Sequence, residues 1–119
     1  MISCSREERY VVAGAIRGGQ NGWFAINDKS HTSINIKEVT VTKGGSIVVY
    51  FKFNAKKIHT FVVTTDERYA SHGYFVGAAV TSNLAKITIY KRDAELISKV
   101  PAQSLINDLG NLWIYGLFC

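Results

Sequence analysis

The sequence predicts an all-β protein: an antiparallel β-sandwich of about eight strands, of jelly-roll or immunoglobulin-like type, with little helix. Three observations lead to this prediction. Apolar residues recur with a period of two, the spacing that places side chains on alternate faces of a strand. Ten glycines separate the apolar runs, and the single proline, Pro101, leaves the strands free to pair. No helical segments alternate with the strands, which argues against a parallel sheet.

The length of 119 residues is enough for one domain with a single core and too short for two ordinary domains. Residues 1–9 are polar and charged, so we expect a lead-in followed by one sandwich domain over residues 10–119. Apolar residues make up 47% of the chain and charged residues 19%, and no low-complexity segment occurs. A packed core is therefore expected.

Strand-like segments bounded by turn residues occur throughout the chain. The expected strands are 10–16, 23–26, 33–42, 47–53, 58–65, 74–80, 84–90 and 111–119. The alternation changes phase within the third segment, and we predict a β-bulge near Lys37-Glu38 because it restores the correct face. Residues 92–109 have partial helical spacing interrupted by Pro101. We expect an irregular excursion there, with at most one helical turn.

The two apolar runs 47–53 and 58–65 are expected to form a hairpin near the centre of a sheet. Both are rich in β-branched and aromatic residues and alternate with a period of two. Between them, Asn54-Ala55-Lys56-Lys57 resembles a four-residue loop, because asparagine tolerates turn geometry and lysines favour water.

The C-terminal segment 111–119 is strongly apolar and must be covered, either by a second sheet or by a neighbouring subunit. The segment that begins at Gly77 is rich in small residues, which permit close approach of another backbone. These two segments supply the candidate subunit-interface residues. They are Gly77, Ala78, Trp113, Tyr115 and Phe118.

Residue patterns typical of catalysis are missing from the sequence. Asp28 and His31 form a carboxylate–imidazole pair, but the surrounding residues are ordinary turn formers. The adjacent Asp66 and Glu67 point apart on an extended chain, and Asp66 is expected to cap the turn after a strand. No histidine or cysteine cluster has metal-ligand spacing, and no nucleotide fingerprint or nucleophile motif occurs. We predict a non-enzyme with no metal and no cofactor.

The two cysteines, Cys4 and Cys119, lie almost at the two ends of the chain. Two interpretations remain open: reduced thiols in frayed termini, or a bridge that joins the ends or cross-links two subunits. No apolar segment approaches the roughly 20 residues of a membrane-spanning helix, and no signal peptide precedes Arg6. We expect synthesis in a cytoplasm and no membrane partner.

The formal net charge of +5 favours anionic partners. The lysines are scattered, which is typical of a solvated basic surface and argues against nucleic acid as the partner. Aromatic residues near strand ends or in loops have two interpretations, core packing or stacking on sugar rings. Candidate contacts for a glycan or a host surface are Trp23, Tyr69, Tyr74, Lys52, Lys56 and Lys57.

Four segments together resemble a known group of proteins: Asn21–His31, Thr65–Glu67, Gly73–Val80 and Asn111–Phe118. Their order and spacing are similar to β-rich domains at the C-terminal ends of tail, fibre and baseplate-associated structural proteins of phages that infect Gram-positive bacteria. The resemblance implies a virion component, made in the host cytoplasm, that assembles with other virion proteins as a homo-oligomer, commonly a trimer.

Two functions follow from these observations. The first is a non-enzymatic phage or prophage structural module of tail or fibre type, acting in assembly or in attachment to the host surface, with an anionic cell-wall polymer or glycan as a possible ligand. The alternative is a carbohydrate-binding β-sandwich of non-viral origin, which requires exposed aromatic residues on one face or in one cluster of loops.

Overall fold

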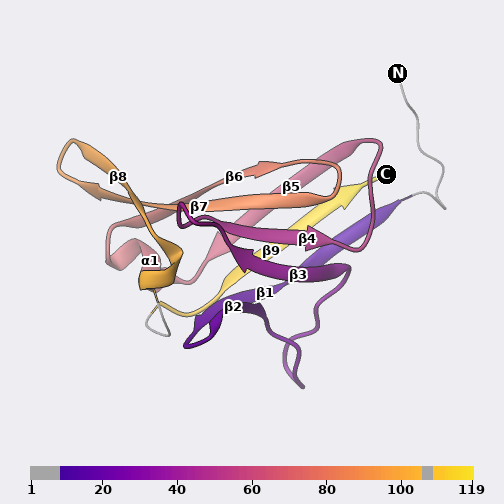
Figure 1. Ribbon diagram of the computed structural model, residues 1–119, viewed down its shortest axis with the longest axis horizontal. Coiled ribbons are helices and arrows are strands. Elements are labelled where there is room, and N and C mark those ends of the chain that lie inside the picture. The colour runs from indigo at the N-terminus through magenta and orange to yellow at the C-terminus, as the bar shows by residue number, and fades with distance from the viewer. Residues whose placement is uncertain (1–8, 106–108) are drawn as a thin grey trace.

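The computed structural model describes residues 9–105 and 109–119. Within these residues, nine strands form two antiparallel sheets that pack face to face as a sandwich, together with one short α-helix (Figure 1). The predicted all-β antiparallel sandwich is confirmed. Most of the proposed lead-in, residues 1–8 with Cys4, lies outside the described residues.

The two sheets differ in size and in the order of their strands. The four-stranded sheet contains, in spatial order, β2 (Gly22–Ala25), β1 (Tyr10–Gly19), β9 (Leu112–Phe118) and β5 (Ile58–Thr65). The five-stranded sheet contains β3 (Ile36–Val41), β4 (Ile47–Phe51), β7 (Leu84–Asp93) and β6 (Tyr74–Val80), with β8 (Leu96–Val100) paired to the distal part of β7. The C-terminal strand β9 is thus central in its sheet, between β1 and β5.

The predicted hairpin between residues 47–53 and 58–65 is wrong, although both segments do form strands. β4 pairs with β3 and β7 in one sheet, whereas β5 pairs with β9 in the other. The intervening residues cross between the sheets. Their backbone is satisfied at distant sites: the Lys56 and Lys57 N–H groups donate to the Cys119 carbonyl at 2.6 and 2.9 Å, and the Ala55 N–H donates to Ser82 at 2.7 Å.

Local irregularities were predicted with mixed success. The register of β3 against β4 shifts between Ile36 and Glu38, which confirms the bulge near Lys37-Glu38. A second shift, between Ile58 and Thr60, was not predicted. Asp66 caps the short helix α1 (Glu67–Ser71), where its side chain accepts from the Arg68 N–H at 3.0 Å.

The region 92–109 contains a strand that the sequence did not predict. After a turn in which Ala94 adopts a φ of +56°, β8 forms a hairpin with β7. Glycine and asparagine are the residues that usually adopt this left-handed conformation, and alanine rarely does. Because alanine stands here, no residue marks the turn in the sequence. A 3₁₀ turn over Ala102–Ser104 follows, in agreement with the single helical turn expected near Pro101.

Aromatic rings join the two sheets at one end of the core. Phe118 on β9 is fully buried, and its ring centroid lies 5.1 Å from those of both Phe51 and Phe53. Gly116 also faces inward, and an added Cβ there would lie 2.6–2.9 Å from Phe118, Phe61 and Val12. A glycine is required at this position because the rings occupy the space of a side chain.

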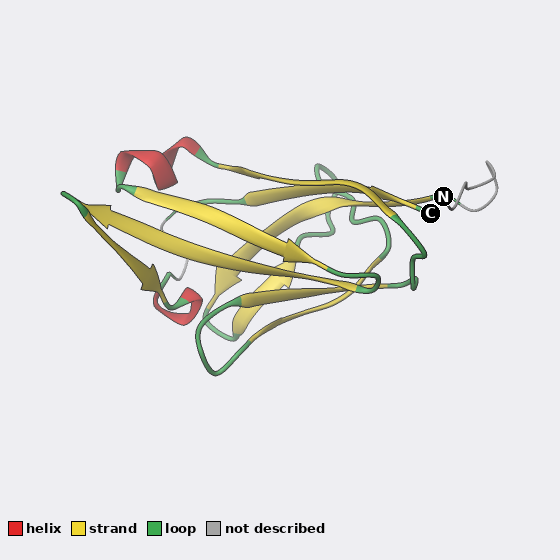
Figure 2. Cartoon of the chain, turned by 90° about the horizontal axis from the view of Figure 1, so that it is seen from above, coloured by secondary structure: helices red, strands yellow, loops and turns green. Residues whose placement is uncertain are grey.

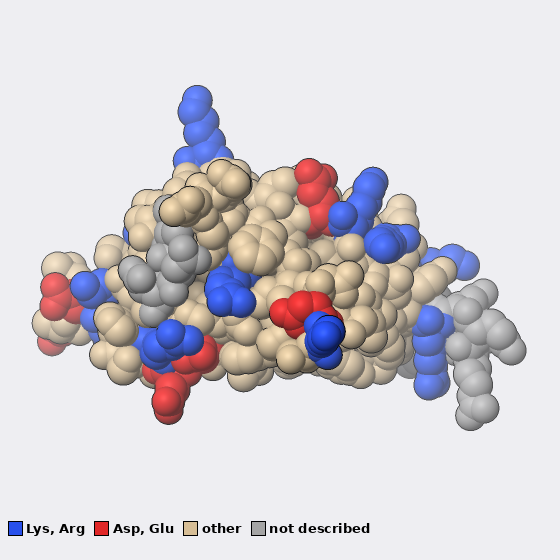
Figure 3. Space-filling model, turned by 90° about the horizontal axis from the view of Figure 1, so that it is seen from below, with Lys and Arg blue, Asp and Glu red and all other residues tan. Residues whose placement is uncertain are grey.

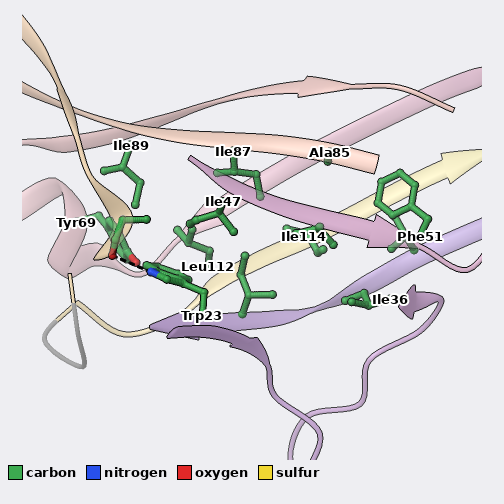
Figure 4. Packing of buried hydrophobic residues seen from close by; sticks show 14 of the residues in the cluster. Trp23, Ile36, Ile47, Phe51, Tyr69, Ala85, Ile87, Ile89, Leu112 and Ile114 are labelled. Carbon is green, nitrogen blue, oxygen red and sulfur yellow. Dashed lines mark hydrogen bonds between the residues drawn. The ribbon is translucent and has the colours of Figure 1, made fainter. Parts of the chain in front are cut away.

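The other end of the core is built around Trp23 and Tyr69, as Figure 4 shows. The Trp23 indole Nε1–H donates a hydrogen bond to the Ala102 carbonyl at 2.8 Å, and the side chain is 6% exposed. Tyr69 projects from α1 and is 1% exposed. Burial raises the pKa of its phenol to about 12, and the Asp66 carboxylate adds to this increase.

Candidate functional site

The outer face of the four-stranded sheet carries exposed apolar side chains on a central strand. Along β9, Leu112, Ile114, Gly116 and Phe118 face the core, so the alternate residues face outward. Of these, Trp113 is 39% and Tyr115 is 45% exposed. The prediction that this strand is covered is therefore met on one face only, because the second sheet buries the inner residues and leaves the outer ones in solvent.

Strand register extends this apolar surface across the sheet. Tyr115 pairs with Val62 of β5 on one side and with Ala13 of β1 on the other, and Ala13 forms a bridge to Ile34. The bridge has two hydrogen bonds, from the Ala13 N–H to Ile34 at 3.1 Å and from the Ile34 N–H to Ala13 at 2.7 Å. Directly paired residues share a face, so these four side chains form one transverse row. Val62 is 50% exposed and Ile34 46%.

The two adjacent rows add further outward-facing residues to this surface. Trp113 pairs with Thr64 and Ala15, and Leu117 pairs with Thr60 and Val11. Ala15 is only 2% exposed although it points outward. The surface formed by the outward residues of these three rows is called the apolar face below. Its members are Val11, Ala13, Ala15, Ile34, Thr60, Val62, Thr64, Trp113, Tyr115 and Leu117.

An arginine lies at the end of the apolar face. Arg17 follows Ala15 by two residues on β1 and pairs with Phe24 of β2, which is 47% exposed. The Arg17 Nε atom is enclosed but has no hydrogen-bond partner in the structure. Leaving a buried donor unpaired costs free energy.

The aromatic residues predicted to contact a glycan lie elsewhere, and two of them are inaccessible. Trp23 and Tyr69 are core residues, as described above, with only 6% and 1% of their surface exposed. Tyr74 is partly buried, since its ring stacks on His72 at 6.2 Å and the Lys91 Nζ lies 5.8 Å from its centroid. The position of an aromatic residue near a strand end or in a loop therefore did not indicate exposure.

The predicted basic contacts lie on the crossover between the sheets. Lys52 and Lys56 are exposed, whereas Lys57 is half-buried. Lys52 shares a hollow with Lys37 and Asn54, among other residues. The charges are mixed on the face that Figure 3 shows, where Lys and Arg side chains are interspersed with Asp and Glu and separated by uncharged surface.

Among the predicted interface residues, Trp113 and Tyr115 lie on the apolar face. Phe118 is 0% exposed, so its prediction as an interface residue is corrected: it faces the core because it is an even-numbered residue of β9. Gly77 and Ala78 are exposed on β6, in the other sheet. Two separate surfaces thus contain the remaining candidates.

Sequence reasoning missed Val62, Ile34, Arg17 and Phe24 as members of an exposed surface. Val62 shares its side of β5 with Thr60 and Thr64, polar residues that are typical of a strand face in water. The only signal in the sequence was one valine among threonines. The contribution of Ile34 depends on its bridge to Ala13, which is a contact between distant segments.

The carboxylate–imidazole pair is part of a turn, as the surrounding residues suggested. The Asp28 Oδ1 atom accepts hydrogen bonds from the backbone N–H groups of Ser30 and His31 at 2.8 and 2.9 Å. The His31 Nδ1 atom lies 3.3 Å from the same oxygen. These hydrogen bonds, led by the one from Ser30, lower the pKa of the Asp28 carboxyl. Within the described residues, no three His, Cys, Asp or Glu side chains form a group that could hold a metal ion.

Comparisons with protein-family models, with curated proteins and with solved structures found no match to this chain. Cys119 is disulfide-bonded. None of the helices in the described segments is both long enough and apolar enough to span a membrane.

Proposed function

We propose that this chain is a non-enzymatic structural module of a phage or prophage particle, of tail or fibre type, whose apolar face packs against a neighbouring copy in a homo-oligomer. The observation that carries the proposal is the in-register row Val62, Tyr115, Ala13 and Ile34, three of whose members are between 45% and 50% exposed. The resemblance of the four sequence segments described above supplies the virion setting.

The composition of the apolar face favours a protein partner. Tyrosine, tryptophan and arginine are the residues most enriched in the energetic centres of protein interfaces, and Tyr115, Trp113 and Arg17 lie together here. The surrounding side chains are aliphatic or small. No acidic residue or lysine is among the members of the face, which is typical of an interface core because charged residues are depleted there.

One observation favours the alternative, a carbohydrate-binding module. Trp113 and Tyr115 are two residues apart on one strand face, so they lie about 7 Å apart, and both present exposed rings that suit stacking on sugars. A sugar also needs hydrogen-bond partners for its hydroxyl groups. Beyond the Tyr115 phenol and the Trp113 indole, the polar groups of the face are Thr60 and Thr64, with Arg17 at its end. We therefore rank this function second.

The proposal predicts that polar substitutions on the apolar face weaken self-association. The double variant Val62→Thr/Tyr115→Thr places a β-branched residue in each strand and removes two of the row's three exposed apolar side chains. Loss of an interface centre costs about 2 kcal/mol or more, which corresponds to an association constant about 30-fold weaker. Light scattering over a concentration series measures this constant for the wild-type and variant chains.

The matched control is Ile97→Thr, which changes an apolar residue that is 54% exposed on β8, in the other sheet. It should leave association unchanged. A wild-type chain that is monomeric at all concentrations would contradict the oligomer. Binding of the wild type, but not of the double variant, to an oligosaccharide array would favour the alternative.

The virion setting is tested by mass spectrometry of purified particles from a host that carries the gene. Absence of the chain from these particles would refute it.

A further inference from the structure

Strand β6 forms the outer edge of the five-stranded sheet, and one set of its backbone groups faces away from the protein. Two hydrogen bonds that continue its ladder with β7 show which set: the Thr81 N–H donates to Leu84 at 2.8 Å, and the Arg92 N–H donates to Gly73 at 3.1 Å. In an antiparallel ladder, residues bonded to the partner strand alternate with residues whose N–H and C=O point to the other side. The odd-numbered residues are therefore bonded to β7. The outward N–H and C=O groups belong to Tyr74, Val76, Ala78 and Val80.

These outward groups are not paired within the part of the chain that the structure describes. β5 is the neighbouring strand on that side of the sandwich, but it belongs to the other sheet, and no backbone hydrogen bond joins it to β6. Figure 1 shows β6 along the upper border of the molecule, and Figure 2 looks onto this side from above. The edge of β6 is therefore open to another strand.

The other edge strands carry features that disfavour strand pairing, whereas β6 carries none. β5, the edge of the four-stranded sheet, has a register shift between Ile58 and Thr60. β3 has a bulge and the charged residues Lys37 and Glu38. β2 is four residues long, and β8 contains Lys99 and is followed by Pro101. Charges, bulges, short length and proline are the usual protections of an exposed edge. β6, with the sequence YFVGAAV, is seven residues long and has no charge, no proline and no register shift.

We propose that β6 pairs with β6 of a second copy of this chain, antiparallel, about a two-fold axis at Gly77. Because the outward groups belong to even-numbered residues, an even-numbered residue must face an even-numbered residue of the second copy. The antiparallel register that overlaps all seven residues places Gly77 opposite Gly77. Each of the four outward N–H groups then meets a carbonyl of the second copy, and the two five-stranded sheets become continuous.

The side chains fit this register. Tyr74 lies opposite Val80 of the second copy, Phe75 opposite Ala79, and Val76 opposite Ala78, so each larger side chain faces a smaller one. On the outer face, a hollow of about 360 Å³ lies over the small residues of β6. The register places Phe75 of the second copy beside this hollow. Its lining residues are Gly77, Ala78, Ala79, Lys86, Thr88 and Tyr90.

This contact does not depend on the proposed function, because β6 and the apolar face are on different sheets. A two-fold contact through β6 occupies only the strand edge and leaves the apolar face available for a separate partner. A chain with both contacts builds an assembly larger than a dimer.

A cysteine at position 77 tests the register directly. Gly77 faces itself across the axis as a pair without mutual hydrogen bonds, for which the Cα–Cα distance is about 4.5 Å, within the range of a disulfide. A Cβ on Gly77 contacts only the Tyr90 ring, at 3.5 Å, so Gly77→Cys is compatible with the fold. We expect mild oxidation to convert this variant to a species of twice the 13.2 kDa chain mass, with the cross-link located at residue 77 by mass spectrometry.

The matched control is Ala79→Cys, which is exposed on the same face of the same strand. In the proposed register the two copies of residue 79 are four residues apart along the strands, about 14 Å, which is too far for a disulfide. We expect no cross-link. Equal cross-linking of both variants, or none in Gly77→Cys, would overturn the register.

A second variant tests the contact without an added cysteine. Ala78→Pro removes one outward N–H, and proline is tolerated where an edge N–H faces solvent. We expect it to lose the two-fold contact that light scattering detects in the wild-type chain. Persistence of that contact in Ala78→Pro would overturn the proposal. The double variant Val62→Thr/Tyr115→Thr, combined with Gly77→Cys, should still cross-link, which separates this contact from the apolar face.

Discussion

Replacing Phe118 with alanine should lower the free energy of unfolding by about 3–5 kcal/mol. The side chain is fully buried between the sheets, and its ring packs at a tilt against those of Phe51 and Phe53, with centroids 5.1 Å apart. Its removal loses the transfer energy of the ring and leaves a cavity that the rigid strands on both sides cannot fill. Urea denaturation of the wild-type and variant chains measures the difference, which is a large part of the 5–15 kcal/mol typical of a domain.

The control for this prediction is Phe24→Ala, which removes the same ring from a half-exposed position on the outer face of β2. Its cost should be about 1 kcal/mol or less. If the two variants were equally stable, the placement of Phe118 in the core would be wrong. Phe118 would then again be a candidate interface residue, as predicted from the sequence.

The stability of the protein should fall steeply between pH 10 and pH 12 because of Tyr69. Burial raises the pKa of this phenol from 10.0 to about 12 in the folded protein. Below pH 10 the phenol is protonated in both the folded and the unfolded states, and its contribution to stability is complete. Between pH 10 and 12 only the unfolded state loses the proton, so unfolding becomes more favourable. The difference of two pKa units corresponds to about 2.7 kcal/mol.

The variant Tyr69→Phe keeps the ring in the core and removes the titrating group. We expect the loss of unfolding free energy between pH 10 and pH 12 to be smaller by about 2.7 kcal/mol in this variant, while its stability at pH 7 changes little. Tyr115→Phe removes one phenol from an exposed position and serves as the control. Urea denaturation at half-unit pH steps gives the slopes, and a slope for Tyr69→Phe that equals the wild-type slope would contradict the assignment.

Local signals in the sequence predicted the strands well. The segments that became β6, β7 and β9 were located within a few residues because alternation or a continuous apolar run is a property of neighbouring residues. The bulge at Lys37-Glu38 was predicted for the same reason, since a change of phase is visible within one strand. β8 was missed because its residues are mostly exposed and its turn uses Ala94, a residue without a turn preference.

The candidate site was predicted less well than the fold. Trp113 and Tyr115 were predicted as interface residues and are exposed on the outer face of β9, yet Phe118 was grouped with them although it faces the core. Trp23 and Tyr69 were candidate ligand contacts, with core packing as the other interpretation, because they stand beside turns. Both are buried, since the 3₁₀ turn and α1 fold back over the open end of the sandwich, and a contact between distant segments leaves no local mark in the sequence.

The sequence by itself determined that this protein is an antiparallel sandwich with a C-terminal strand too apolar to stand alone. Only the tertiary structure decided that β4 and β5 lie in different sheets, that β9 is central, and which side chains meet across strands to form the apolar face. The physical reason is that a strand's alternation depends on its own residues, whereas its partner is selected by packing between segments far apart in the chain. Tyr115, Val62, Ala13 and Ile34 become one surface only through such pairing.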